Sequence, residues 1–370
     1  MAKSRTWRLG LLVGSLISIL LGIALYALMT AARPAARQTW LSKDPVVSLQ
    51  FSPDGQHLAL GTVGQQGEAS QIRRIGDGAV ERAWPAGSVV AFSPDGKLLA
   101  HIRDSNTFGL WQVSDGQLVR MFTFTKSVVY SNWPALAFSP DGRWLATGAQ
   151  SAIQLWDVST GRLVYTLDRG AVQWSRTTGL AFSPDSQILA ASSNRLVRLW
   201  AVGSGQLTAT LQGYQGNGAL STIFTDQGTD EEDLEAITTL AFSPDGQLLA
   251  AGSGSAEDAR SEDHTIRVWR LVDRRLIQTL TQPQYAVTSV AFSPDGRWLA
   301  AGGGAKVDYP DSFLKNLPDI VIRIWHTSDW QLTNTYTGHQ DVIWSIGWNP
   351  DGHTLASGSQ DGTIRFWQVK

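Results

Sequence analysis

The stretch LAFSPDGQLLAAG at residues 240–252 decides the fold, because it is one copy of a unit that recurs along the chain. In each copy an apolar run leads into a Ser-Pro-Asp-Gly turn, and a second apolar run follows. Proline presets φ for a tight turn, and aspartate and glycine tolerate the next positions. The motif therefore predicts two short antiparallel strands. Seven copies occur, two of them variants, and their prolines are Pro53, Pro94, Pro140, Pro184, Pro244, Pro294 and Pro350.

Two further runs complete each unit. A third run ends in a bulky residue, as in Ile266-Arg267-Val268-Trp269, and a polar turn then opens a fourth. The turns recur at intervals that suit four short strands and their connections, with occasional insertions. Such a meander cannot bury both faces alone, whereas seven stacked radially can. The sequence therefore predicts an all-β, seven-bladed β-propeller over residues 37–370.

A tryptophan closes the third strand in six of the seven units. Burying one removes ~150–250 Å² from water, so we expect these rings to pack between blades. In the first unit we expect Ile75 at this position. The six residues are Trp111, Trp156, Trp200, Trp269, Trp325 and Trp367.

The turn and the strand-ending tryptophan together resemble the WD-repeat family over residues 36–370. The last unit matches most fully: the resemblance implies that its His339, Ser357, Asp361 and Trp367 form that family's hydrogen-bonded structural tetrad. Asp263 and Asp319 hold the equivalent aspartate position in two other units. Only Trp156-Asp157 is a literal Trp-Asp pair, and a Gly-His pair precedes the first strand of a unit only at Gly338-His339.

An apolar segment without a single charged residue, 9–29, precedes the repeats. At ~1.5 Å per residue a helix of this length spans the ~30 Å hydrocarbon core of a bilayer. We expect a basic flank over 1–8, a single N-terminal transmembrane helix over 9–29 and a short linker over 30–36, as in a membrane-anchored, bacterial-type member of the family. Three basic residues flank the segment on each side, and the free amino terminus adds one positive charge before it, which predicts a cytoplasmic N-terminus and an extracytoplasmic propeller. The alternative is a signal peptide cleaved at Thr30-Ala31-Ala32.

The last unit stops after its third strand, at Lys370. Residues 37–41 resemble the fourth strand at 277–280, so we expect them to complete the seventh blade and lock the ring. This strand would start at the face of the tight turns, close to the end of the apolar segment. The membrane would then lie near the tight-turn face, and the opposite face would look away from it.

The long insertions all fall on that opposite face, at residues 213–236, 254–263 and 303–318. Loops on a rigid frame commonly carry function, so we expect this face to bind a protein or peptide. The first two loops are acidic, which favours a cationic partner; a solvated loop is the alternative. Exposed Trp144, Trp298 and Trp330 are further contact candidates. The acidic candidates are Asp226, Asp230, Glu231, Glu232, Asp233, Glu235, Glu257 and Asp258.

Composition argues against several other classes. A net charge of −2 gives no reason to expect nucleic acid. The chain has no cysteine, its six histidines form no spaced ligand pair, and no glycine-rich loop opens a helix. We therefore expect a monomeric, non-catalytic scaffold without metal or cofactor. Two alternatives remain, a periplasmic propeller similar to that of the Tol system and an enzyme on a propeller frame, because fold alone does not settle function.

Overall fold

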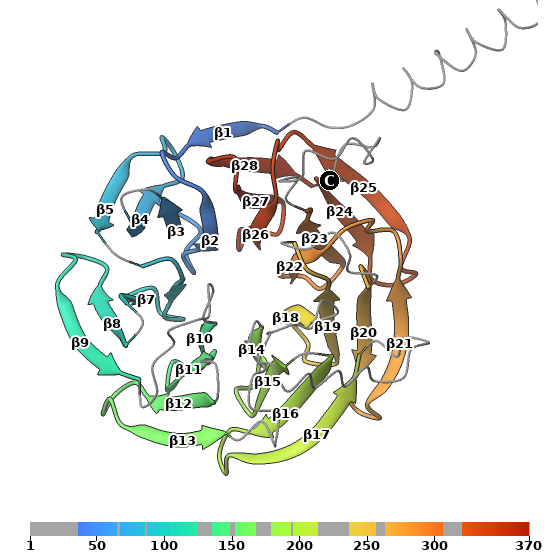
Figure 1. Cartoon of the computed structure of the whole chain (residues 1–370), viewed down its shortest axis with the longest axis horizontal. Helices are drawn as coiled ribbons and strands as arrows, with labels where there is room; N and C mark the ends of the chain where they lie inside the picture. The colour runs from blue at the N-terminus through green and yellow to red at the C-terminus, as the bar shows by residue number, and fades with distance from the viewer. Residues whose placement is uncertain are drawn as a thin grey trace, which may run out of the picture.

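The computed structural model describes residues 36–64, 67–85, 87–104, 106–124, 135–148, 152–167, 179–193, 195–213, 237–256, 263–305 and 320–369. Their strands form seven antiparallel sheets of four strands each, set around a common axis like the blades of a propeller (Figure 1). The predicted all-β, seven-bladed architecture is confirmed. Within these described ranges, no helix is long and apolar enough to cross a membrane. Residues 9–29, where we expect one, lie outside them.

Each blade is a meander whose first strand lines the centre of the ring and whose fourth strand lies outermost. Blade 1 comprises β2 (Val46–Phe51), β3 (His57–Gly64), β4 (Gly67–Arg74) and β5 (Val80–Trp84), and blade 2 comprises β6 (Val90–Phe92), β7 (Leu98–Ile102), β8 (Thr107–Gln112) and β9 (Leu118–Thr123). Blade 3 comprises β10 (Leu136–Phe138), β11 (Trp144–Gly148), β12 (Ile153–Asp157) and β13 (Leu163–Leu167), and blade 4 comprises β14 (Leu180–Phe182), β15 (Ile188–Ser193), β16 (Leu196–Ala201) and β17 (Gln206–Gln212). Blade 5 comprises β18 (Ile237–Phe242), β19 (Leu248–Ser253), β20 (Ile266–Arg270) and β21 (Arg275–Leu280). Blade 6 comprises β22 (Val287–Phe292), β23 (Trp298–Gly303), β24 (Val321–His326) and β25 (Leu332–Thr337). Blade 7 combines β26 (Ile343–Trp348), β27 (Thr354–Ser359) and β28 (Thr363–Gln368) with β1 (Gln38–Leu41).

The Ser-Pro-Asp-Gly motif joins the first two strands of a blade through its own side chains. In blade 1, the Ser52 hydroxyl donates to the Asp54 carboxylate and accepts the backbone N–H of His57 at 2.9 Å. Gly55 adopts a φ of 68°, a left-handed conformation that glycine reaches without steric cost. In the fourth copy Ser186 takes the same conformation, with a φ of 62°. The repeated motif thus fixes the turn by local chemistry alone.

The strand-ending tryptophans occupy one register position. Each pairs with a leucine of the second strand, as Trp367 does with Leu355, and the ring is buried. In blade 1 the residue in this register, opposite Leu58, is Arg73. The expectation of Ile75 there was wrong, because β4 ends at Arg74 and Ile75 lies in the following turn.

Strand β1 closes the ring, because it pairs antiparallel with β28 and joins residues from the two ends of the described chain. Gln38 lies opposite Phe366 and Leu41 opposite Thr363, and Figure 1 shows the two strands side by side. Trp40 is buried with its ring 4.6 Å from that of Phe366. Arg73, in the position of the missing tryptophan, donates to the Leu41 carbonyl at 3.1 Å. Blade 1 thereby holds the closing strand.

Hydroxyl groups on the inner strands link four successive pairs of blades. Each hydroxyl accepts a backbone N–H from the inner strand of the next blade, which pairs a donor that the sheet itself leaves open. The links run from Val290 to Thr239 (3.2 Å), from Ile346 to Ser289 (3.1 Å), from Leu49 to Ser345 (3.1 Å) and from Val90 to Ser48 (3.3 Å).

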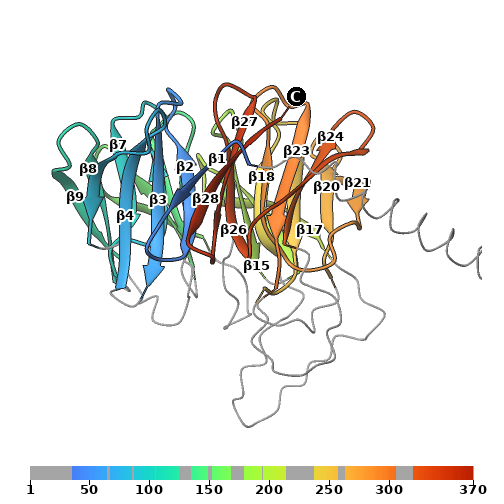
Figure 2. The ribbon, with the colours of Figure 1, turned by 90° about the horizontal axis from the view of Figure 1, so that it is seen from above.

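The alternation of strand directions gives the ring two different rims, seen edge-on in Figure 2. The Ser-Pro-Asp-Gly turns lie at one rim, which we call the turn rim. Strand β1 starts there, since it runs antiparallel to β28. The strand ends that flank the three long insertions, Gln212 and Ile237, Ser253 and Ile266, and Gly303 and Val321, lie at the other, which we call the loop rim.

Candidate functional site

The acidic candidates at the loop rim lie outside the described residues. This holds for Asp226, Asp230, Glu231, Glu232, Asp233, Glu235, Glu257 and Asp258. The described base of the second loop contains Asp263, which is 1% exposed and forms an ion pair with Arg267 at 2.7 Å. This carboxylate is occupied inside the blade, so the acidic contacts remain predictions for the loops themselves.

The three candidate contact tryptophans differ in exposure. Trp144 is 7% exposed and packs in a core cluster, with the Arg143 guanidinium 4.6 Å above its ring. Its expected exposure was wrong, because β11 turns the ring inward toward blade 4. Trp298 and Trp330 are partly buried against neighbouring core clusters. Trp144 is thus part of the core, and the other two rings pack against it rather than standing free at the surface.

The turn rim carries a ring of aspartates already engaged by their own turns. The hydroxyl of Ser52 lowers the pKa of Asp54, and that of Ser243 does the same for Asp245. Each blade holds one such carboxylate by local hydrogen bonds, and the lowered pKa keeps Asp54 and Asp245 ionised at neutral pH. Within the described ranges, no group of three or more histidine, aspartate and glutamate side chains is placed to hold a metal ion.

The tetrad of blade 7 is joined by hydrogen bonds. His339 Nε2 lies 2.7 Å from Ser357 Oγ and its Nδ1 3.0 Å from Asp361, while the Trp367 indole N–H donates to the same Ser357 Oγ at 2.8 Å. Thr363 adds a contact of 3.0 Å to His339. Burial lowers the pKa of His339; it raises that of Asp361, but the hydrogen bonds from His339 and Thr363 outweigh this and lower the Asp361 pKa.

The register identifies the residue that replaces Ser357 in other blades. Ser357 lies two residues after the leucine that pairs with the tryptophan, and Thr147 in blade 3 bonds the Trp156 indole N–H from this position at 3.1 Å. In blade 2 the position holds His101.

His101 fills its position by stacking. Its ring lies 3.6 Å from that of Trp111, with an interplanar angle of 17°. The side chain is 1% exposed, and neither ring nitrogen has a hydrogen-bond partner. Desolvation, with a smaller contribution from Arg103, lowers the pKa of His101 to about 3. The imidazole is therefore neutral at physiological pH. The sequence showed this histidine but not that its partner is an aromatic ring.

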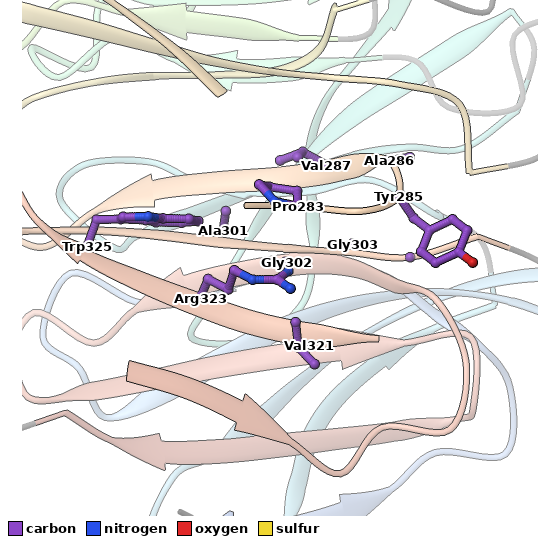
Figure 3. Close-up of a pocket in the computed structure, with 11 residues that line it drawn as sticks. Pro283, Tyr285, Ala286, Val287, Ala301, Gly302, Gly303, Val321, Arg323 and Trp325 are labelled. Carbon is purple, nitrogen blue, oxygen red and sulfur yellow. The ribbon is translucent and has the colours of Figure 1, made fainter. Parts of the chain in front are cut away.

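Blade 6 has alanine, Ala301, at the same position, and a hollow lies beside it. The hollow measures about 250 Å³ with its open mouth. Figure 3 shows Pro283, Ala301, Val321, Arg323 and Trp325 around it. The Trp325 indole nitrogen is buried without a hydrogen-bond partner. The sequence did not indicate this site, because its signal is the absence of the tetrad histidine and serine from blade 6.

Comparison with known proteins matches the repeats to a family. The model described as "WD domain, G-beta repeat" matches residues 120–157, 161–201, 224–270, 274–308 and 330–368, more than half of the chain. These matches begin at residue 120, so all of blade 1 lies outside them. Propellers of this kind are generally protein-interaction scaffolds without catalytic activity.

Curated relatives share parts of the chain. WD repeat-containing protein 26 homolog of Arabidopsis thaliana is 24% identical over 326 residues, which are 80% of this chain and 50% of that protein. Human Coronin-7 is 34% identical over 136 residues, 36% of this chain and 13% of that protein. Eukaryotic translation initiation factor 3 subunit I of Neurospora crassa is 44% identical over 52 residues, 14% of this chain and 15% of that protein. The chain spans half or less of the length of these relatives, which are all eukaryotic.

Proposed function

We propose, because the chain belongs to the WD-repeat family, that its propeller is an interaction scaffold that binds a protein or peptide at the loop rim. The observation that carries the proposal is that all three long insertions start and end at this one rim. Around them, the closing strand and the inter-blade hydroxyl links make the ring a continuous frame. A rigid frame with extended loops on one side is a common arrangement for recognition.

The partner surface we propose is basic. Six acidic and no basic residues fall between positions 226 and 235, and Glu257 and Asp258 follow in the second loop. Charge complementarity steers encounter and selects partners, and its contribution falls as salt screens exposed charges. A cationic segment of a protein or peptide therefore suits these loops.

We further propose that residues 9–29 anchor the propeller in a membrane. The segment contains no charged residue, and β1, which begins a short distance after it, starts at the turn rim. With the N-terminus cytoplasmic, the propeller would lie outside the cytoplasm with its loop rim facing away from the bilayer. Treatment of intact cells with an external protease tests this orientation, since a cytoplasmic propeller would be protected.

The experiment on the binding face compares the full-length chain with two variants. One replaces residues 214–236 by a short Gly-Ser linker; the other keeps the length and changes the six acidic residues of this loop to Asn or Gln. Partners captured from membranes by the full-length chain are identified, and their affinities are measured at 50 and 500 mM salt. We expect both variants to weaken binding at least tenfold and high salt to weaken only the unmodified chain strongly.

The matched control neutralises charge at the turn rim instead, through Asp115→Asn and Asp329→Asn. This variant should bind like the unmodified chain. Equal affinity of all versions for every captured partner would place recognition elsewhere on the propeller.

A further inference from the structure

The hollow in blade 6 lies at the position that the tetrad side chains occupy in blade 7. Ala301 pairs with Arg323 as Ser357 pairs with Arg365. Pro283 precedes the first residue of its inner strand, Val287, by four residues. His339 precedes Ile343 by the same four. Two of the hydrogen-bonding side chains of blade 7 are thus replaced by side chains that cannot bond.

A third replacement completes the change. Val321 lies two residues before Arg323, where blade 7 has Thr363 two residues before Arg365. Pro283, Ala301 and Val321 all line the hollow, together with Trp325. The remaining member, Asp319, lies outside the described residues.

The tryptophan itself is retained, and this leaves a buried donor without an acceptor. Trp325 is 0% exposed, and its indole nitrogen has no hydrogen-bond partner. In blades 3 and 7, the same indole nitrogen is bonded, to Thr147 and to Ser357. A buried unpaired N–H is costly, and most such groups in proteins find a partner. An indole N–H only donates, so the missing partner must be an acceptor.

The hollow is accessible from the loop rim. Its lining runs from the buried Trp325 and Ala301 to the partly exposed Pro283, Tyr285 and Arg323. Gly303 and Gly304, the first residues of the third long insertion, also line it. Most of its 250 Å³ is the open mouth, and the space that a water-sized atom can occupy is about 10 Å³. This is room for about one water-sized group, such as a single oxygen atom at the tip of a side chain.

We propose that this hollow is an anchor subsite that takes one oxygen acceptor, the carboxylate or amide carbonyl at the tip of a partner's short side chain. The acceptor oxygen receives the Trp325 indole N–H, and the positively charged Arg323 lines the way in. The identity of the occupant as part of a protein partner rests on the proposed function. The acceptor chemistry rests on the hollow and its unpaired donor alone.

The test uses the full-length chain labelled with ¹⁵N at tryptophan and follows the indole N–H signals by NMR. Sodium acetate and acetamide are titrated separately at constant ionic strength, as charged and neutral acceptors. We expect the Trp325 signal to move and to saturate at millimolar probe, while Trp156 and Trp367 stay in place because they are already bonded. A stronger response to acetate identifies a carboxylate as the natural occupant, and a stronger response to acetamide identifies an amide.

Ala301→Ser fills the site from within, since it supplies the hydroxyl that Ser357 supplies in blade 7. We expect it to weaken the response of Trp325 at least tenfold. The matched control is Ala251→Ser, the same change at the equivalent register of blade 5, which should leave the response intact. Trp325→Phe assigns the signal.

A Trp325 signal that neither probe moves, or that moves no more than those of Trp156 and Trp367, overturns the proposal. The titration of the unmodified chain decides this even if Ala301→Ser does not fold. The small probes require no protein partner, so the result is independent of the capture experiment. If the full-length chain captured no partner while acetate still moved the Trp325 signal, the result would contradict the scaffold function but not the subsite.

Discussion

Blades 7 and 2 place different chemistry beneath the same tryptophan. In blade 7, Ser357 connects Trp367 to His339 through hydrogen bonds. In blade 2, His101 at the equivalent position stacks on Trp111 and bonds nothing. Both tryptophans are buried. The repeat therefore preserves the packing of the ring, while the polar groups beside it vary from blade to blade.

The same two blades also differ in how the chain builds them. Blade 2 is one continuous segment, whereas blade 7 combines β26–β28 with β1 from the other end of the chain. Stability in blade 7 thus depends on a contact between distant segments and on a polar network. In blade 2 it depends on local packing and on the charge state of one imidazole.

Removal of the closing strand β1 should lower the stability of the propeller more than any other change considered. A chain that begins at Pro45 lacks β1 and loses the burial of Trp40, worth at most about 4–6 kcal/mol. At about 2–4 °C per kcal/mol for a large domain, we expect its Tm to lie about 10 °C below that of a chain beginning at Pro34. Differential scanning calorimetry measures the difference. Leu41→Ala is the control, because this side chain is 75% exposed and should change little. Equal Tm values for the two chains would mean that β1 does not lock the ring.

Loss of the central acceptor of the tetrad should have the next largest effect. Ser357→Ala leaves the Trp367 indole N–H and His339 Nε2 without their shared partner, so we expect a loss of about 2–4 kcal/mol in the free energy of unfolding. Thr147→Ala in blade 3 removes one such bond and should cost about 1–2 kcal/mol. Urea denaturation gives both values, with the exposed Ser204→Ala as control. A Ser357→Ala effect no larger than that of Ser204→Ala would show that the network does not stabilise the blade.

His101 should give blade 2 a pH dependence. Its pKa in the folded state, about 3, lies below the 6.5 of a histidine in an unfolded chain, so protonation favours the unfolded chain. The stability from this neutral imidazole is complete above pH 6.5 and falls toward pH 3 at ~1.4 kcal/mol per unit. Between pH 7 and pH 5, the unmodified chain should lose about 2 kcal/mol more than His101→Phe, which keeps the stacking. Urea denaturation at the two pH values measures this.

The control for this pH experiment is His353→Phe, on an exposed side chain of blade 7. It should keep the pH dependence of the unmodified chain. If His101→Phe loses as much stability as the unmodified chain between the two pH values, the imidazole is not held neutral by the fold.

The sequence predicted the fold well because the information is local and repeated. A Ser-Pro-Asp-Gly turn such as Ser52–Gly55 closes through its own side chains, so its structure does not depend on distant residues. The position of Arg73 was missed because an apolar residue was expected opposite Leu58. The strand pairing, which depends on where the neighbouring turn ends, instead places Arg73 opposite Leu58.

The candidate site was less predictable for a different reason. Residues such as Asp226 attract notice by their charge, whereas Ala301 and Pro283 matter through the groups that they lack. Nothing in an isolated alanine indicates a hollow beside a buried donor. Spacing from Pro294 and Pro350 aligns Ala301 with Ser357, but only the folded blade shows the hollow and the unpaired indole N–H beside it.

The closing strand also sets the order of events during synthesis. Gln38 emerges from the ribosome long before its partner Phe366, because almost the whole propeller lies between them in the chain. At ~5–20 residues per second the delay is roughly 15–65 s. Blades 1 to 6 can each form as their own strands emerge, but β1 waits as an unpaired segment throughout. The nascent ring stays open until β28 has emerged, and during this interval a chaperone could occupy its unpaired edge.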